Sequence, residues 1–348
     1  MNYYTDTYPG RKVTVMGKDY LYFGGTSYLG LQSNPGFQEL YIQNIRKYGT
    51  NYAASRKSNI KISVFEKTEA ALATLVGSET STTLSSGYLA GQLIAQHFDT
   101  EAFKCFYGPN SHSALFQKET IPFENFKDLL RALQEFKESR QVKIPVVFLD
   151  SIDTQEASYP HFKGLQDLPL NEVILVVDDS HGIGVLGEKG GGAYQIIKKM
   201  LPQELIVCCS LGKGFGIQAG AVFGTKARID LLTKTDFFGG ASPAAPAALA
   251  TFSEGQPIYE TQRAVLKENL ERFLNKTQEI DQFRFIQGHP AFAFENSELA
   301  NYLKERGVLI TNFKYPSDEG ILMSRIVISA AHTKKDIELL AEVLNSYK

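Results

Sequence analysis

Three apolar runs that each end at polar residues constrain the fold more than any other feature of this sequence. They are Pro145–Asp150 (PVVFLD), Val173–Asp178 (VILVVD) and Leu205–Cys209 (LIVCC), and helix-like stretches such as Phe126–Arg140 lie among them. Short, continuous apolar runs are typical of strands that are buried on both faces, as in parallel sheets. We therefore expect an α/β fold with a mostly parallel sheet flanked by helices.

The length of the chain allows one large domain and a smaller unit. It has 348 residues, of which 43% are hydrophobic, and a chain of this size can bury a large core. We expect an N-terminal segment (residues 1–40) that packs with the small domain, a large domain (41–241) and a small C-terminal α+β domain (242–348).

Charge and cysteine content exclude several kinds of partner. The formal net charge is −2, and no long block of one sign occurs, so neither nucleic acid nor a membrane surface is expected. Cys105, Cys208 and Cys209 give neither a disulfide framework nor the spacing of metal ligands. The first eleven residues lack the features of a signal peptide, and no apolar run reaches ~18 residues. We expect a cytoplasmic protein without a membrane span, and a small ligand.

Local patterns predict several further elements. Lys12–Met16 and Asp19–Phe23 form a hairpin pattern. Ser63 and Glu66 have the spacing of a capping box ahead of an amphipathic helix that Gly77 would stop. Towards the C-terminus the pattern predicts a helix, a strand and a helix, over Arg263–Lys276, Ser324–Ser329 and Thr333–Tyr347.

Lys213 is the first candidate for chemistry. It lies in Ser210–Gly216 (SLGKGFG), directly after the third apolar run, and ligands bind at the carboxyl ends of parallel strands. A lysine becomes a nucleophile towards a carbonyl when partial burial or a nearby charge lowers the pKa of its amine. A lysine in a glycine loop is more often structural, so the assignment depends on its neighbours.

Asp178 ends the preceding apolar run and could pair with a protonated pyridine nitrogen, with Asp179 as the alternative. Pyridoxal 5′-phosphate (PLP) acts as an electron sink when its ring nitrogen stays protonated, and a fixed carboxylate keeps it so. His181 could bind the phenolic oxygen of the same ring, and His112 could lie flat against it. Either histidine alone would be an ordinary loop residue.

A phosphate could bind at Ser85–Tyr88 (SSGY), which precedes an apolar helical stretch. The amides of Gly87 and Tyr88 would then form a helix N-terminus, although a plain helix start is the alternative. Gly182–Gly187 (GIGVLG) matches the dinucleotide pattern G-x-G-x-x-G, but Glu188–Gly192 (EKGGG) is a poor helix start. We therefore do not expect NAD to bind there.

Seven short segments, in this order along the chain, resemble the α-oxoamine synthases, a family of PLP-dependent transferases of fold type I. The match runs from about Gly17 to the C-terminus and rests on Tyr28–Leu31, Ser86–Tyr88, Ser111-His112, Asp178–Gly182, Ser210–Gly216 with Gly220, Ser242-Pro243 and Ser329–His332. The resemblance implies a large PLP-binding domain, a smaller C-terminal α+β domain and a homodimer.

The resemblance also implies how PLP is held. Lys213 would carry it as a Schiff base, Asp178 would hold the pyridinium nitrogen, His112 would stack on the ring and His181 would contact the phenolic oxygen. The phosphate would be held by Gly87, Tyr88 and Ser210, and Ser151 falls where the family has a further serine that contacts the cofactor. Lys213, His112 and Asp178 are the predicted catalytic residues.

Arg325 matches the arginine with which the family binds the carboxylate of an amino acid, and a guanidinium suits such bidentate binding. Thr26 stands where an asparagine commonly helps to bind the same carboxylate. Lys314 stands where a threonine is usual in the 8-amino-7-oxononanoate synthase branch, and Gly239-Gly240 replaces a hydroxyl-bearing pair that reaches the phosphate of a neighbouring subunit.

The reaction that the resemblance implies is a decarboxylating condensation. An amino acid displaces Lys213 from the cofactor, and the freed lysine removes the Cα proton. The substrate then attacks an acyl thioester on CoA or an acyl carrier protein. We expect L-alanine and a pimeloyl thioester, as in the 8-amino-7-oxononanoate synthase branch and in biotin synthesis. The alternatives are a glycine C-acetyltransferase or serine palmitoyltransferase type, an aminotransferase, or a PLP-dependent sensor without turnover.

Overall fold

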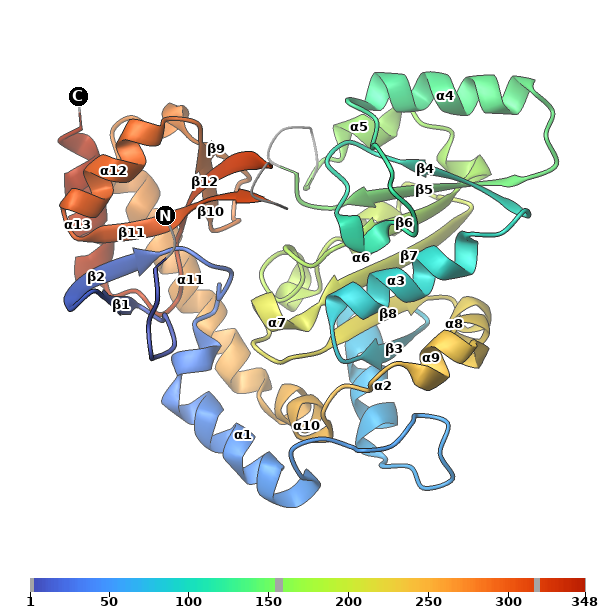
Figure 1. The fold of residues 1–348 in the computed structure, drawn as a ribbon, viewed down its shortest axis with the longest axis horizontal. Helices are drawn as coiled ribbons and strands as arrows, with labels where there is room; N and C mark the ends of the chain where they lie inside the picture. The colour runs from blue at the N-terminus through green and yellow to red at the C-terminus, as the bar shows by residue number, and fades with distance from the viewer. Residues whose placement is uncertain (1–2, 154–158, 316–319, 348) are drawn as a thin grey trace. The chain divides into compact units, whose positions relative to one another are not determined.

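The computed structural model describes residues 3–153, 159–315 and 320–347. Its contacts divide the chain into two compact units: the first unit consists of Met1–Glu39 and Gly255–Lys348, and the second unit of Leu40–Glu254. Each unit contains its own sheet (Figure 1). The predicted boundaries at residues 40 and 242 stay predictions about functional domains.

The sheet of the second unit has the strand order β3-β8-β7-β6-β5-β4. Its strands are β3 (Thr80–Leu84), β4 (Phe103–Tyr107), β5 (Ile144–Asp150), β6 (Ile174–Asp178), β7 (Glu204–Ser210) and β8 (Gly220–Gly224). Strands β4 to β7 run parallel to one another, whereas β8 is antiparallel to both β7 and β3. The three apolar runs form the adjacent strands β5, β6 and β7 (Figure 1). The predicted, mostly parallel sheet is confirmed.

Helices connect and cover these strands. Helix α1 (Pro35–Tyr48) continues from the first unit into the second. The helices that follow it in the second unit are α2 (Val64–Val76), α3 (Gly87–Phe98), α4 (Phe126–Glu138), α5 (Lys163–Gln166), α6 (Tyr194–Lys198), α7 (Leu211–Gly214), α8 (Lys226–Lys234), α9 (Asp236–Gly240) and α10 (Pro246–Glu254). The apolar side of α3 packs through Leu93, Ile94 and Phe98 into a core that includes Val176 and Ile206 of the sheet. Each such fully buried side chain contributes about 1.5–3 kcal/mol, so the core fixes the strand ends that carry the polar residues.

The first unit contains a second sheet, in the order β1-β2-β11-β12-β10-β9. Its strands are β1 (Lys12–Val15), β2 (Lys18–Phe23), β9 (Arg284–Phe285), β10 (Ala291–Phe294), β11 (Val308–Tyr315) and β12 (Ile321–Val327), and its helices are α11 (Gln256–Lys276), α12 (Ser297–Glu305) and α13 (Lys334–Asn345). The predicted hairpin is confirmed as β1 and β2. Strand β2 pairs in parallel with β11, so the beginning and the end of the chain share one sheet.

One predicted helix start is wrong in its detail. Ser63 precedes α2, but its backbone is already helical (φ −60°, ψ −14°) and its side chain makes no capping hydrogen bond, so there is no capping box. Gly77 ends α2 as predicted, with φ 80°. The chain does form a capping box at α13, where Thr333 and Asp336 bond reciprocally.

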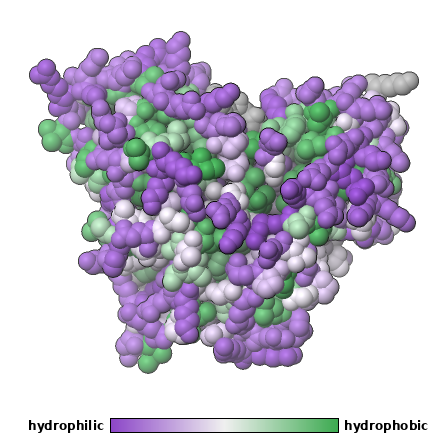
Figure 2. All heavy atoms as spheres, turned by 180° about the vertical axis from the view of Figure 1, so that it is seen from behind, coloured by the Kyte–Doolittle hydropathy of each residue, from purple (hydrophilic) through white to green (hydrophobic). Residues whose placement is uncertain are grey.

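Polar and charged side chains cover most of the face that Figure 2 shows, and apolar side chains appear there in separate patches. None of the helices that the structure describes has both the length and the hydropathy needed to cross a bilayer.

Candidate active site

The carboxyl ends of β5, β6 and β7 bring the predicted polar residues together. Asp150 of β5 is in register with Asp178 of β6, and Ser210 ends β7 beside them. Backbone hydrogen bonds extend the ladder past the strand ends, from Ser151 N to Asp178 O (2.9 Å) and from Asp179 N to Cys208 O (2.8 Å). These loops are therefore fixed to the sheet where they carry their side chains.

Lys213 lies in the single turn of α7, directly after β7. Ser210 caps this turn by accepting a hydrogen bond from Gly212 N, and Ser210 N donates to Ser180 Oγ at 2.8 Å. Lys213 Nζ lies 2.9 Å from His181 Nε2. The structure thus places the predicted nucleophile and the predicted partner of a phenolic oxygen in direct contact.

Asp178 is a buried carboxylate at this edge. Its side chain is 7% exposed, and its Oδ1 accepts a hydrogen bond from Ser180 N at 2.8 Å. The negative charge of Asp178 acts on both His112 and Asp150. It is therefore placed to hold a protonated nitrogen of a bound ring.

His112 begins the short 3-10 segment Ser113–Leu115 and reaches the same cluster. Its Nδ1 accepts a hydrogen bond from Ala114 N at 3.1 Å. Burial lowers the pKa of His112, the charge of Asp178 opposes this, and Lys213 lowers it further. The imidazole is therefore neutral at physiological pH, as suits a ring that packs against another ring.

Two further carboxyl groups complete the cluster. Asp150 Oδ1 accepts a hydrogen bond from His112 N at 3.0 Å, and its pKa is raised well above the usual range, chiefly by burial and then by Asp178. Asp179 is 1% exposed, and burial raises its pKa to about 7. Asp150 ends an apolar run and Asp179 directly follows one, but nothing in the residue pattern distinguished their roles from that of Asp178.

The contacts of Asp179 are structural. Its Oδ1 accepts a hydrogen bond from Ser151 Oγ at 2.5 Å and its Oδ2 accepts one from Ala193 N at 2.9 Å. Ser151 itself is fully buried. Its hydroxyl is thus engaged by Asp179, and its contact with the cofactor stays a prediction.

The predicted phosphate end is also assembled within the second unit. Ser86 caps α3 by accepting a hydrogen bond from Leu89 N, and the N–H groups of Gly87 and Tyr88 stand in the first turn, where a helix leaves N–H groups without intrahelical partners. A methyl group at Gly87 would lie 2.7 Å from Cα of Ser210. The helix start therefore packs directly against the end of β7, and only glycine permits this approach.

Two departures from the family pattern are visible in the second unit. Gly239 and Gly240 end α9. Ser55 Oγ donates to Gly239 O at 2.6 Å, and a side chain at Gly239 would meet that of Lys57 at 2.9 Å. At Gly240 a methyl group would meet no neighbour within 4 Å among the described residues.

Arg325 and Thr26, predicted to bind an amino acid, lie in the first unit. Arg325 is in register with Thr311 of β11, and Thr311 Oγ1 accepts a hydrogen bond from Gly25 N at 3.0 Å, so the bend that carries Thr26 is tied to the neighbouring strand. The Nε of Arg325 is buried and has no hydrogen-bond partner among the described residues. This donor is suited to an anionic ligand. Lys314 lies on β11 and is exposed.

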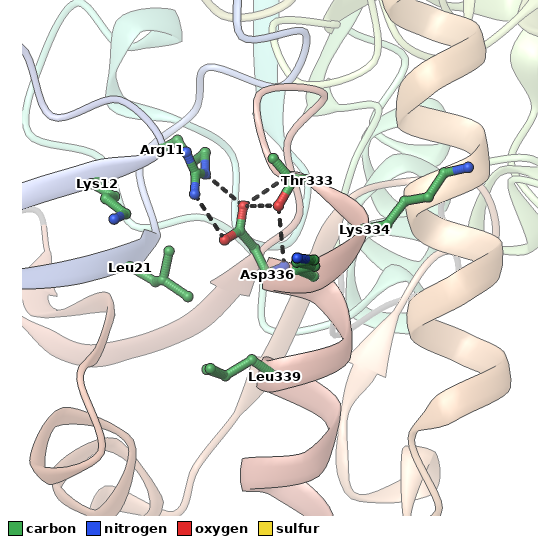
Figure 3. Close-up of a pocket in the computed structure, with 8 residues that line it drawn as sticks. Arg11, Lys12, Leu21, Thr333, Lys334, Asp336 and Leu339 are labelled. Carbon is green, nitrogen blue, oxygen red and sulfur yellow. Dashed lines mark hydrogen bonds and ion pairs between the residues drawn. The ribbon is translucent and has the colours of Figure 1, made fainter.

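A groove in the first unit is not a candidate site. It has a volume of about 750 Å³ and is lined by Arg11, Lys12, Leu21, Thr333, Lys334, Lys335, Asp336 and Leu339 (Figure 3). Arg11 Nε donates to Asp336 Oδ2 at 2.6 Å, and the same carboxylate accepts from Thr333. Asp336, the one acidic residue among the described residues that line the groove, thus joins the segment before the hairpin to α13 through its bonds to Arg11 and Thr333.

The cluster of the second unit fits PLP. An amine lies beside an imidazole, a buried carboxylate ends the neighbouring strand, and a glycine that tolerates no side chain opens a helix next to a serine. These groups match an aldehyde, a ring nitrogen and a phosphate, respectively. Among the described residues, no group of three or more His, Cys, Asp or Glu side chains could hold a metal ion.

Known proteins resemble this chain over most of its length. The family model of aminotransferase class I and II matches residues 114–344. The 8-amino-7-oxononanoate synthase of Cronobacter sakazakii is 28% identical over 360 aligned residues, which cover 97% of this chain and 91% of that protein.

Solved structures show the same fold. A serine palmitoyltransferase from S. paucimobilis with a bound PLP–myriocin aldimine has a TM-score of 0.82 at 17% identity, covering 99% of this chain and 92% of that one. An 8-amino-7-oxononanoate synthase from Francisella tularensis has a TM-score of 0.70 at 20% identity, covering 94% and 97%. The predicted fold type I and the resemblance to the α-oxoamine synthases are confirmed.

Proposed function

Because the chain belongs to the aminotransferase class I and II family, we propose that it is a PLP-dependent acyltransferase of the 8-amino-7-oxononanoate synthase type. It condenses an amino acid, L-alanine in the first instance, with a pimeloyl thioester and releases CO₂. The observation that carries the proposal is the contact of Lys213 Nζ with His181 beside the buried Asp178. The name of the relative from Cronobacter sakazakii supports the choice of substrates.

The residues of the second unit would hold the cofactor as follows. Lys213 would anchor it covalently through Nζ, Asp178 would hold the proton of the ring nitrogen, and His112 would cover the ring. The N–H groups of Gly87 and Tyr88 would bind the phosphate, together with the hydroxyl of Ser210. Bound PLP supplies an electron sink for negative charge that develops on the Cα of the amino acid.

Lys213 would have a second task once the amino acid has taken its place. A neutral amine is a base, and Lys213 Nζ lies at the carboxyl end of the sheet, 2.9 Å from His181 Nε2. Lys213 would then take the Cα proton. A general base contributes about 10²–10⁴-fold to the rate.

Arg325 is the proposed ligand of the substrate carboxylate, supported by its buried Nε without a partner among the described residues. By holding that carboxylate, Arg325 would keep the amino acid in place until the carboxylate leaves as CO₂. The homodimer, the cytoplasmic location and the delivery of the acyl group by CoA or by a carrier protein stay predictions.

The test is an assay with L-alanine and pimeloyl-CoA on the PLP-loaded protein. We expect thiol and CO₂ to be released in equal amounts, and we expect Lys213→Ala to lower the rate by at least about 10²-fold. Lys226→Ala is the matched control, because Lys226 is an exposed lysine of the same unit. Transfer of the amino group to a 2-oxo acid without release of CO₂ would show an aminotransferase instead.

The anchor is tested separately by reducing the PLP-loaded protein with borohydride and mapping its peptides. We expect the cofactor on Lys213 alone. Its recovery on another lysine would remove the basis of the proposal.

A further inference from the structure

Asp150 is a second carboxyl group at the proposed cofactor site, and its position suggests a function of its own. It ends β5 in register with Asp178 of β6. Residues in register on adjacent parallel strands point to the same face of the sheet. The two carboxyl groups are therefore neighbours on the face that carries the site.

The surroundings of Asp150 disfavour a second negative charge. The charged and titratable groups that act on it are Asp178 of β6, Asp153 of its own loop and Lys213 of α7. Two of the three are carboxylates, and no ion pair joins Asp150 to a basic side chain among the residues that the structure describes. Two carboxylates that share a buried site cannot both ionise easily.

Asp150 also holds His112 in place. Its Oδ1 accepts a hydrogen bond from His112 N at 3.0 Å, at the residue that begins the 3-10 segment Ser113–Leu115. A neutral carboxyl group retains a carbonyl oxygen that can accept this bond. Because the backbone of His112 is held in this way, the position from which its side chain extends is fixed as well.

We propose that Asp150 is a positioning residue that holds the backbone of His112 through Oδ1 and so fixes the imidazole of His112 at the cofactor site. This inference rests on the proposed function only for its consequence, which is an imidazole held in place against the cofactor ring. Burial and the charge of Asp178 raise the pKa of Asp150, whereas the hydrogen bond from His112 N and the charge of Lys213 lower it.

The protonation state is tested by NMR on the full-length chain with ¹³C-labelled aspartate, with and without added PLP. Asp150→Asn identifies the Cγ resonance of Asp150 by removing it, and Asp230→Asn removes that of an exposed aspartate on α8 as the matched control. We expect Asp150 to lose its proton above the usual range of an aspartate, because burial and the charge of Asp178 raise its pKa. A resonance of Asp150 that titrates together with that of Asp230 would overturn the proposal.

The positioning role is tested by the dissociation constant of PLP, measured from the absorbance of the bound cofactor. Asp150→Asn keeps an acceptor for His112 N, so we expect a change of less than about threefold. Asp150→Ala leaves His112 N without this acceptor, and we expect PLP to bind about tenfold more weakly, because the N–H group loses its hydrogen bond. An equal loss in both variants, or no loss in either, contradicts the role.

These outcomes are distinct from failure of the proposed function. A chain that binds PLP but does not condense alanine with a thioester still gives both measurements. If PLP does not bind at all, the titration of the cofactor-free chain still shows whether Asp150 shares a buried edge with Asp178.

Discussion

Replacing Asp179 by asparagine should change how the stability of the protein depends on pH. Burial raises the pKa of Asp179 from 3.8 to about 7, so the folded chain binds this proton more tightly than the unfolded chain does. The stability that the proton contributes is present below about pH 4 and is lost as the pH rises to about 7. At ~1.4 kcal/mol for each tenfold change in proton affinity, the loss between pH 5 and pH 8 is about 2–3 kcal/mol.

Asp179→Asn should remove this dependence without disturbing the packing. The amide oxygen can accept from Ala193 N, and the amide nitrogen can donate to Ser151 Oγ, so both observed hydrogen bonds have a counterpart. The free energy of unfolding of the variant should therefore rise by about 2–3 kcal/mol relative to that of the wild type between pH 5 and pH 8.

The assay is unfolding by urea, followed by circular dichroism, of the cofactor-free wild type and variant across this pH range. The quantity compared is the difference between their free energies of unfolding at each pH, because other titrating groups cancel in it. Asp230→Asn is the control and should give a flat difference, since Asp230 is exposed and paired only on the surface. A flat difference for Asp179→Asn as well would refute the reasoning.

Three further variants test other parts of the structure. Gly87→Ala should weaken PLP binding at least about tenfold, because an added methyl group collides with the end of β7 and one lost bond to a charged group is worth about 1.5–3 kcal/mol. Gly224→Ala, where a methyl group would make only ordinary contacts, at 3.7 Å or more, with the described residues, should leave the dissociation constant unchanged. His332→Gln should lessen acid destabilisation by about 2 kcal/mol at pH 5 in urea unfolding, because burial lowers the pKa of this histidine to about 4 and the wild type loses stability as the pH falls below about 6.5. Arg56→Ala should lower the free energy of unfolding by about 3–5 kcal/mol, measured in the same way, because it removes the cation that lies 2.7 Å from the carboxylate of Glu69 and leaves that carboxylate with hydrogen bonds from the neutral groups of Thr83 to balance its charge.

The sheet of the second unit could be predicted from the sequence because its signal is local. Continuous apolar runs are hard to place anywhere but in buried strands, and their polar ends then fall at one edge. The same reasoning brought Asp178, Ser210 and Lys213 together, and the structure places them on adjacent elements. The lengths of the strands and loops alone set how far apart these three residues lie in the sequence.

Residues whose roles depend on tertiary contacts could not be assigned in this way. Asp150, Asp178 and Asp179 each lie at a strand end, and only the structure shows that one accepts from His112 N and another from Ser151 and Ala193. Ser63 had the right spacing for a cap, but its backbone joined the helix. The spacing of residues in the sequence shows which hydrogen bonds are possible, but it does not show which of them form.

The glycines that resemble a dinucleotide motif have a different explanation in the structure. A methyl group at Gly184 would lie 2.8 Å from Cα of Gly214 in α7, and one at Gly182 would collide with the carboxylate of Asp179. These glycines let the loop after β6 pack directly against the turn that carries Lys213, and let a buried carboxyl group fit beneath it. The pattern G-x-G-x-x-G here therefore reports close packing of two backbones, which is the physical requirement it shares with nucleotide-binding loops. A pattern of glycines indicates that another group comes close to the backbone at these residues. Whether that group is a ligand or another segment of the chain has to be found from the fold.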